Sequence, residues 1–152
     1  MKKLVIVDID GTISTIGDRL KYLKQTPKDY ESFYADDFDD EPIQEMCDLV
    51  SILKHHYDIV FLTGRRDSAM LATEKWIRKH IFKNVFEDYL GMTLIMRPSN
   101  DHRKDIEVKI DQFLKAGLKV EDIAFVLEDR DSMVEMWRNL GVKCLQVCNG
   151  NY

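Results

Sequence analysis

Hydrophobic and polar positions follow one another in blocks along this chain. Short, continuous apolar runs, mostly rich in β-branched residues, alternate with longer segments whose apolar residues stand three or four positions apart. Runs of four or five mostly apolar residues predict strands buried on both faces, because a half-exposed strand would alternate apolar and polar side chains. We expect five such strands, at Leu4 to Val7, Asp58 to Leu62, Thr93 to Met96, Ile123 to Leu127 and Lys143 to Val147.

Amphipathic helices are expected between these strands. The apolar stripes predict helices at Pro42 to His55, Asp67 to His80, Arg103 to Ala116 and Ser132 to Leu140. Strands that alternate with helices indicate a parallel sheet covered on both faces. The predicted fold class is therefore α/β, a three-layer sandwich around a five-stranded parallel, Rossmann-like sheet, with residues 1–152 forming a single domain.

The segment between the first strand and the first long helix is less regular. Ser14 to Gln25 fits a short amphipathic helix or an irregular loop, and we expect its basic side chains near Asp8. Thr26 to Pro42 fits a loop-rich excursion. Its acidic residues are expected to be solvated turn residues rather than a second metal site, and they are Asp36, Asp37, Asp39 and Asp40.

Composition places the chain among ordinary globular proteins. Of its 152 residues 45% are hydrophobic and 32% are charged, and no apolar run approaches the length of a membrane span. The N-terminus enters a strand with no apolar signal region, so we expect a cytoplasmic protein with no membrane partner. Its three cysteines, Cys47, Cys144 and Cys148, lack the spacing of a zinc site, and we expect buried free thiols.

The net charge of −5 argues against broad nonspecific binding of duplex nucleic acid, but leaves room for a local basic patch that grips one phosphate.

Two carboxylates directly follow the first strand. Asp8 and Asp10 lie on the same face of the extended chain, and Gly11 lets the backbone turn away beside them. A buried, unpaired carboxylate costs several kcal/mol, so this pair points to a cation, most simply a metal ion. The alternatives are an acidic turn that only caps a helix, and a loop that only binds calcium or turns the chain.

Further polar groups follow the other central strands. Thr63 and Gly64 end the second strand and Glu128 and Asp129 end the fourth, and the carboxyl ends of parallel strands meet at one edge of a sheet. A hydroxyl and backbone N–H groups at such a position suit a phosphate. The sequence thus predicts a site for a metal ion and a phosphate at this edge.

These residues resemble the haloacid dehalogenase superfamily of phosphotransferases. The matching motifs are Asp8-Ile9-Asp10-Gly11-Thr12, Thr63, Lys109 and Glu128-Asp129, and they span the chain. The resemblance implies the fold of that superfamily and a phosphatase activity. The intervals between the motifs leave no room for a cap domain with its own core, so we expect a minimal cap or none and an open site.

Further motifs resemble the 3′-phosphatase domains of bacteriophage polynucleotide kinase-phosphatases. They are Thr63-Gly64-Arg65, Arg103-Lys104-Asp105 followed by Lys109, Glu128-Asp129-Arg130, and Arg19. The resemblance implies hydrolysis of a 3′-terminal phosphate of DNA or RNA. No Gly-x-x-x-x-Gly-Lys-Ser/Thr loop occurs, so we expect a stand-alone phosphatase for which a separately encoded kinase or ligase is a potential partner.

The same resemblance implies a role for each site residue. Asp8 is the expected nucleophile, forming an aspartyl-phosphate, and Asp10 the general acid and base, helped to hold a proton by neighbouring carboxylates. The expected Mg²⁺ ligands are Asp8, the Asp10 backbone carbonyl and Asp129, while Glu128 either orients a metal-bound water or supports Lys109. Thr63 and Lys109 are expected to hold the transferring oxygens.

Arginines near these motifs are candidates for substrate binding. We expect Arg65 and Arg103 to grip the phosphate or its neighbour, with structural ion pairs as the alternative, and Arg19 to contact the strand. Asp105 is expected to orient Arg65 or Arg103. Three other arginines, Arg66, Arg97 and Arg130, are expected at the surface, and both tryptophans, Trp76 and Trp137, in the core.

Two other functions stay open at this point. One is a phosphatase of small phosphomonoesters such as nucleotides, and the other is a module that binds phosphorylated ends without turnover. An open site favours a phosphate carried by a large molecule.

Overall fold

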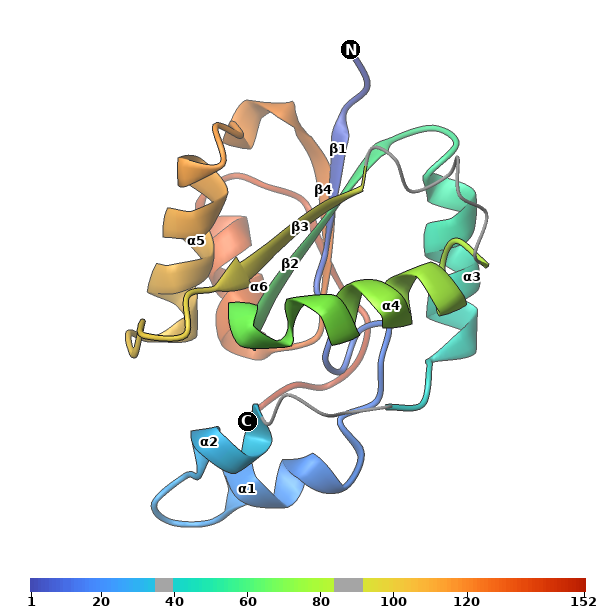
Figure 1. Cartoon of the computed structure of the whole chain (residues 1–152). Coiled ribbons are helices and arrows are strands. Elements are labelled where there is room, and N and C mark those ends of the chain that lie inside the picture. The colour runs from blue at the N-terminus through green and yellow to red at the C-terminus, as the bar shows by residue number, and fades with distance from the viewer. Residues whose placement is uncertain (35–39, 84–91) are drawn as a thin grey trace.

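A computed structural model describes residues 1–34, 40–83 and 92–152 of the chain. Within these residues the chain forms one five-stranded parallel sheet in the order β3-β2-β1-β4-β5 (Figure 1). The strands are β1 (Leu4–Val7), β2 (Asp58–Arg66), β3 (Thr93–Arg97), β4 (Ile123–Glu128) and β5 (Cys144–Gln146). The predicted fold class is confirmed.

The strand order places a reversal of direction beside β1. The chain moves outward from β1 to β2 and β3, then returns to place β4 on the other side of β1. Val7 at the end of β1 pairs with Phe61 on one side and Leu127 on the other. The residues that follow Val7 and Leu127 therefore emerge together, at the position where open α/β sheets bind their ligands.

Four longer helices cover the sheet in two layers (Figure 1). Helices α3 (Gln44–Leu53) and α4 (Met70–His80) pack on one face, and α5 (Asp105–Lys115) and α6 (Asp131–Asn139) on the other. Trp76 is buried in the first core and Trp137 in the second, as predicted. Because successive strand residues point to opposite faces, the apolar runs fill both cores.

Several predicted boundaries shift by a few residues. Strand β2 continues to Arg66 rather than Leu62, because Arg66 pairs with Arg97 of β3 after a register shift. Helix α5 begins at Asp105 rather than Arg103. The prediction of buried thiols holds for Cys47 and Cys144, but is wrong for Cys148, which is exposed beyond the end of β5.

The irregular segment after β1 forms a small excursion beyond the carboxyl ends of the strands (Figure 1). It contains helices α1 (Leu20–Lys24) and α2 (Tyr30–Phe33). The excursion buries a small cluster of Ile16, Leu23 and Phe33, which is far smaller than the core of a cap domain, so the expectation of a minimal cap or none holds. The excursion is a minimal cap.

The acidic residues Asp36, Asp37 and Asp39 of the excursion lie outside the described residues. In the part of the chain that is described, no helix combines the length and apolar character needed to cross a membrane.

Phe113 tests the core beneath α5. Its side chain is fully buried and contacts Trp137 edge to face, with ring centroids 5.9 Å apart. We expect Phe113→Ala to lower the free energy of unfolding by about 3–5 kcal/mol, because it leaves a cavity. Urea denaturation measures this, and the adjacent exposed Leu114→Ala, expected to change it by less than about 0.5 kcal/mol, is the control. Equal losses would contradict the assigned packing.

Candidate active site

Three buried carboxylates meet where β1 and β4 end. Asp8, Glu128 and Asp129 are at most 6% exposed, and each offers an oxygen within 4.8 Å of the others. Burial and the charge of Glu128 raise the pKa of Asp8 to about 7, and burial and the charge of Asp8 raise that of Asp129 to about 6. Such a cluster of oxygen ligands, short of positive charge, fits a hard divalent cation.

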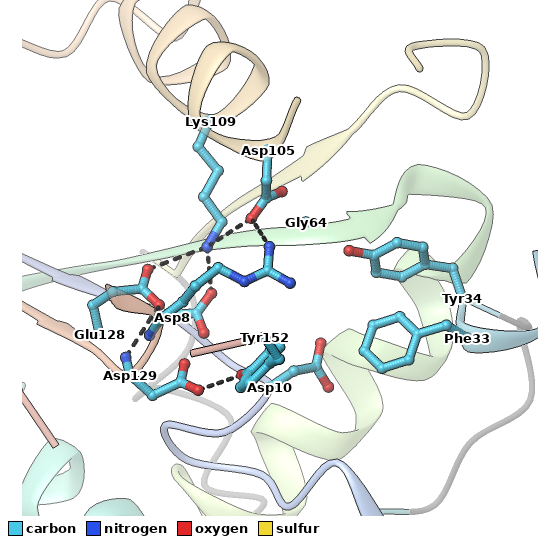
Figure 2. A pocket seen from close by; sticks show the side chains of 11 residues that line it. Asp8, Asp10, Phe33, Tyr34, Gly64, Asp105, Lys109, Glu128, Asp129 and Tyr152 are labelled. Atoms are coloured by element: carbon cyan, nitrogen blue, oxygen red, sulfur yellow. Dashed lines mark hydrogen bonds and ion pairs between the residues drawn. The ribbon is translucent and has the colours of Figure 1, made fainter. Parts of the chain in front are cut away.

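Lys109 brings one cation to this cluster from α5 (Figure 2). Its Nζ lies 2.6 Å from Asp8 Oδ1, 3.3 Å from Glu128 Oε2 and 3.7 Å from Asp105 Oδ2. Burial lowers the pKa of this ammonium, but the carboxylates outweigh burial and hold the pKa well above its ordinary value. Lys109 therefore stays charged beside Asp8.

Asp10 has a different environment from Asp8. Its carboxylate accepts hydrogen bonds from Arg65 Nε at 2.9 Å, Arg65 Nη2 at 2.7 Å and Arg19 Nη2 at 2.8 Å. Burial raises the pKa of Asp10, but the two guanidinium groups outweigh burial and lower the pKa below its ordinary value. The expectation that neighbouring carboxylates help Asp10 to hold a proton is therefore wrong for this arrangement.

Asp40 joins the same two arginines. Its Oδ2 lies 2.5 Å from Arg19 Nη2 and 3.0 Å from Arg65 Nη2. The Asp40 side chain is only 9% exposed, so the prediction of a solvated turn residue is wrong for Asp40. Arg65 is 1% exposed and forms the structural ion pair that the sequence left as an alternative.

The basic residues of the excursion divide between site and surface. Arg19 reaches Asp10, whereas Lys21 and Lys24 are exposed, and the Lys21 ammonium lies over the Tyr22 ring. The expectation that these basic side chains gather at Asp8 is therefore wrong, since only the first of the three lies in the site.

Asp105 binds other arginines than those expected. Its carboxylate lies 3.0 Å from Arg97 Nη2 and 3.3 Å from Arg130 Nη1, so the prediction that it orients Arg65 or Arg103 is wrong. Arg97 is buried rather than at the surface because it also donates to backbone carbonyls of the following turn.

Arg103 lies outside the acidic pocket. Its guanidinium, 47% exposed, pairs with Asp101 at 2.6 Å and with Asp111 at 2.8 Å. Arg65 therefore lies inside the site, whereas Arg103 lies on the surface beside it.

Thr63 and Gly64 occupy the end of β2 beside the pocket. Thr63 is buried, and its hydroxyl accepts a hydrogen bond from the backbone N–H of Arg65 at 3.1 Å. Gly64 lines the pocket, and a Cβ at this position would come within 2.5 Å of Asp105 Oδ1 and 3.0 Å of the Tyr34 hydroxyl. A larger residue at Gly64 would therefore displace the pocket wall.

Sequence reasoning missed several residues that shape the site. The Thr12 hydroxyl lies 3.4 Å from Asp8 and 3.3 Å from Asp129, and Tyr152 donates a hydrogen bond to Asp129. Phe33 and Tyr34 close another side of the pocket (Figure 2). Thr12 lies inside the motif that begins at Asp8 and could have been predicted. No sequence pattern places Phe33, Tyr34 and Tyr152 at this edge of the sheet.

The pocket enclosed by these groups is narrow. Its cavity volume is about 30 Å³, space for only a few water-sized groups. Carboxylates line one side and the Lys109 ammonium another (Figure 2). The arrangement offers a nucleophilic carboxylate, a fixed cation and a set of oxygen ligands around a space that admits a small polar group.

Comparison with known proteins agrees with this geometry. Residues 2–152 match the family described as the polynucleotide kinase PNKP phosphatase domain. The chain belongs to this family. This family is part of the haloacid dehalogenase superfamily, which the sequence motifs resemble, so the resemblance is confirmed.

One curated relative of this phosphatase domain is a putative bifunctional polynucleotide kinase/RNA ligase of Autographa californica nuclear polyhedrosis virus. It is 29% identical over 147 residues, which cover 92% of this chain and 18% of the viral protein. The chain thus spans less than a fifth of that protein's length.

Among solved structures, a chain of the Pnkp1/Rnl/Hen1 complex superimposes with a TM-score of 0.75 at 29% identity, covering 100% of this chain and 48% of the other. A haloacid dehalogenase family enzyme of Bacteroides thetaiotaomicron, complexed with magnesium and inorganic phosphate, gives a TM-score of 0.54 at 15% identity, covering 96% and 94%. The latter likeness shows the fold alone.

Lys109 tests the electrostatics of the pocket. Without metal, with EDTA present, we expect Lys109→Met to lower the free energy of unfolding by about 3–5 kcal/mol at pH 8, because the buried carboxylates lose their cation. This loss of stability should be smaller at pH 5.5. As the pH falls through the raised pKa of Asp8, about 7, the Asp8 carboxylate takes up a proton in the folded state, and a neutral carboxyl group does not need the charge of Lys109. Urea denaturation at both pH values measures this.

Lys115→Met is the matched control, because Lys115 stands on the same helix, is 65% exposed and pairs with Asp111 at the surface. It should change the free energy of unfolding by less than about 0.5 kcal/mol. A loss in Lys109→Met that is the same at both pH values would contradict the buried charge cluster.

Proposed function

We propose that this domain is a Mg²⁺-dependent polynucleotide 3′-phosphatase, which hydrolyses the 3′-terminal phosphate monoester of DNA or RNA through an aspartyl-phosphate. The observation that carries the proposal is the buried Asp8 carboxylate that lines a narrow pocket, 2.6 Å from a charged Lys109 and beside two further carboxylates. Membership in a family of polynucleotide kinase phosphatase domains supports a phosphate on a nucleic-acid end.

Asp8 is the proposed nucleophile. Its carboxylate oxygen attacks phosphorus, the bond from phosphorus to the 3′ oxygen of the sugar breaks, and the electron pair leaves with that oxygen. Water then attacks the phosphorus of the aspartyl-phosphate, which releases inorganic phosphate and restores Asp8. Lys109, held charged beside Asp8, stabilises the negative charge on the transferring oxygens, together with Thr63 and the backbone N–H of Gly64.

Asp10 is the proposed acid and base. The arginines that lower its pKa suit the second step, in which an ionised carboxylate takes a proton from water. In the first step Asp10 must donate a proton to the leaving oxygen. An arriving phosphate dianion competes for Arg19, whose side chain is 13% exposed, and loss of that contact raises the pKa of Asp10. Arg65 stays in place and orients Asp10.

The acidic cluster fits the proposed metal ion. Asp8 and Asp129, with the Asp10 backbone carbonyl, would hold Mg²⁺, and Glu128 would reach it through water or serve Lys109 alone. When bound, Mg²⁺ screens the repulsion between an anionic nucleophile and a phosphate dianion. Thr12 and Tyr152 donate hydrogen bonds to Asp129 and fix its orientation.

A kinase or ligase is the proposed partner of this domain in the repair of nucleic-acid ends. The viral relative is named as a polynucleotide kinase/RNA ligase, and the structural relative belongs to a Pnkp1/Rnl/Hen1 complex. Either a separate protein or further segments of a longer chain can supply those activities.

Phosphate release from defined substrates tests the proposed activity. With Mg²⁺, we expect release from an oligonucleotide 3′-phosphate, but neither from the 5′-phosphorylated oligonucleotide nor, at comparable kcat/KM, from a 3′-mononucleotide. Asp8→Asn should lower kcat by at least about 10³-fold, because the amide is a poor nucleophile. The exposed Asp58→Asn, at the opposite end of the strands, is the matched control and should retain activity.

The other outcomes separate the alternatives. Equal release from all three substrates would indicate a general phosphatase of small phosphomonoesters. Release from none, with tight binding of the 3′-phosphorylated oligonucleotide, would indicate a module that binds phosphorylated ends.

Metal binding is testable apart from turnover. Because an ion that binds only the folded state stabilises it, Mg²⁺ at about 100 times its Kd should raise the free energy of unfolding by about 2.7 kcal/mol. We expect Asp129→Asn to reduce this stabilisation strongly and Asp58→Asn to leave it intact, as followed by thermal denaturation across a Mg²⁺ series. Undiminished stabilisation of Asp129→Asn would contradict the assigned ligands.

A further inference from the structure

A second, larger cavity adjoins the catalytic pocket. Its volume is about 620 Å³, within the range of about 300–1,000 Å³ typical of ligand pockets. Tyr34, Asp105 and Arg130 line both cavities and form the wall between them. Figure 2 shows the Tyr34 hydroxyl pointing into the inner pocket toward Gly64.

The inner pocket is too small for a whole nucleotide. A cavity of about 30 Å³ holds a phosphoryl group at most and has no room for a sugar or a base. The rest of a large substrate must therefore lie outside the inner pocket. The larger cavity shares lining residues with the inner pocket, and its volume is sufficient for the sugar and base of a nucleotide.

The larger cavity is positively charged, although the chain as a whole carries −5. Five cationic side chains line it against two carboxylates. Within the described part of the chain the exposed Lys104 ammonium makes no ion pair. Arg66 pairs with Glu31, and Arg103 pairs with Asp101 and Asp111. In each pair one partner is open to solvent, and surface pairs of this kind are weak enough to exchange for a phosphate.

Two tyrosines give this basic cavity an aromatic side. The rings of Tyr30 and Tyr34 are nearly parallel, with an interplanar angle of 13° and centroids 6.5 Å apart. Tyr30 is 46% exposed, so part of its side chain is open to solvent. Cations that follow a phosphate backbone, combined with aromatic rings on which bases stack, are the features that bind single-stranded nucleic acid without reading its sequence.

We propose that this cavity binds the nucleotides next to the 3′ end of a single-stranded polynucleotide. A base stacks on Tyr30, and the phosphates that precede the terminal nucleotide contact Lys104, Arg66 and Arg103. This inference rests on the proposed function for the identity of the substrate. It adds the part of the site that selects a polymer over a mononucleotide.

The first test compares substrates of increasing length. We expect the ratio of kcat/KM for an octanucleotide 3′-phosphate to that for a mononucleoside 3′-phosphate to fall about tenfold or more in Tyr30→Ala and several-fold in Lys104→Ala. Tyr30→Phe keeps the ring and should keep the ratio. Lys143→Ala, which removes an equal charge from the amino end of β5, is the matched control. An unchanged ratio in both alanine variants overturns the proposal.

The second test does not depend on turnover. Fluorescence anisotropy measures binding of a single-stranded oligonucleotide with a 3′-hydroxyl, and Tyr30→Ala and Lys104→Ala should weaken it. Lys104→Ala should also reduce the slope of log K against log salt concentration by about 0.7, the value for one phosphate contact on a single strand. Unchanged affinity and slope overturn the proposed cavity even if the enzyme is active.

The two tests keep the proposals distinguishable. If no 3′-phosphate is released by the wild-type protein but both variants weaken oligonucleotide binding, the cavity stands and the proposed reaction fails. If 3′-phosphate is released with the same preference for polymers in every variant, the reaction stands and the cavity fails.

Discussion

The acidic edge of the sheet depends on the ion pairs that the buried Lys109 ammonium makes with Asp8 and Glu128. It sits between the carboxylates of Asp8 and Glu128 at the ends of β1 and β4, where burial and the charge of Glu128 raise the pKa of Asp8 to about 7. Lys109 reaches them because Val108 and Phe113 of the same helix are buried and fix α5 against the sheet. The position of a charged group in the site is thus set by apolar packing at a distance from it.

A second set of ion pairs ties the excursion to the sheet. Arg19 comes from the excursion and Arg65 from β2, and both bind Asp10 and Asp40. The excursion is thus attached to the sheet by these four ion pairs, while a small apolar cluster fills its interior. The two aspartates of the first motif differ in environment: burial and the charge of Glu128 raise the pKa of Asp8, whereas the guanidinium groups of Arg65 and Arg19 outweigh burial and lower the pKa of Asp10.

The sequence allowed prediction of the sheet, its helical layers and the strand ends that carry the polar groups, because apolar periodicity and the position of a residue after a strand are local properties. It did not allow prediction of ion partners. Arg97 was expected at the surface because a lone arginine usually lies there, yet Asp105, supplied by another element, draws it inside. Asp40 was misjudged for the same reason, since its partners Arg19 and Arg65 are distant in the chain. Partner choice depends on tertiary distances that no spacing encodes.

The acidic character of the inner pocket bears on the choice of substrate. Clustered carboxylates repel a phosphate dianion, whereas the cationic side chains of the adjoining cavity attract it, and one of them, Arg130, lines both cavities. The cationic side chains of that cavity, among them Lys104 and Arg103, therefore offset part of the repulsion. In the proposed binding mode, a polymer with several phosphates gains from each of these cations, whereas a free mononucleotide does not reach them. Binding energy from nucleotides that do not react would then hold the terminal phosphate against Asp8, which is how contacts remote from the reacting bond contribute to rate.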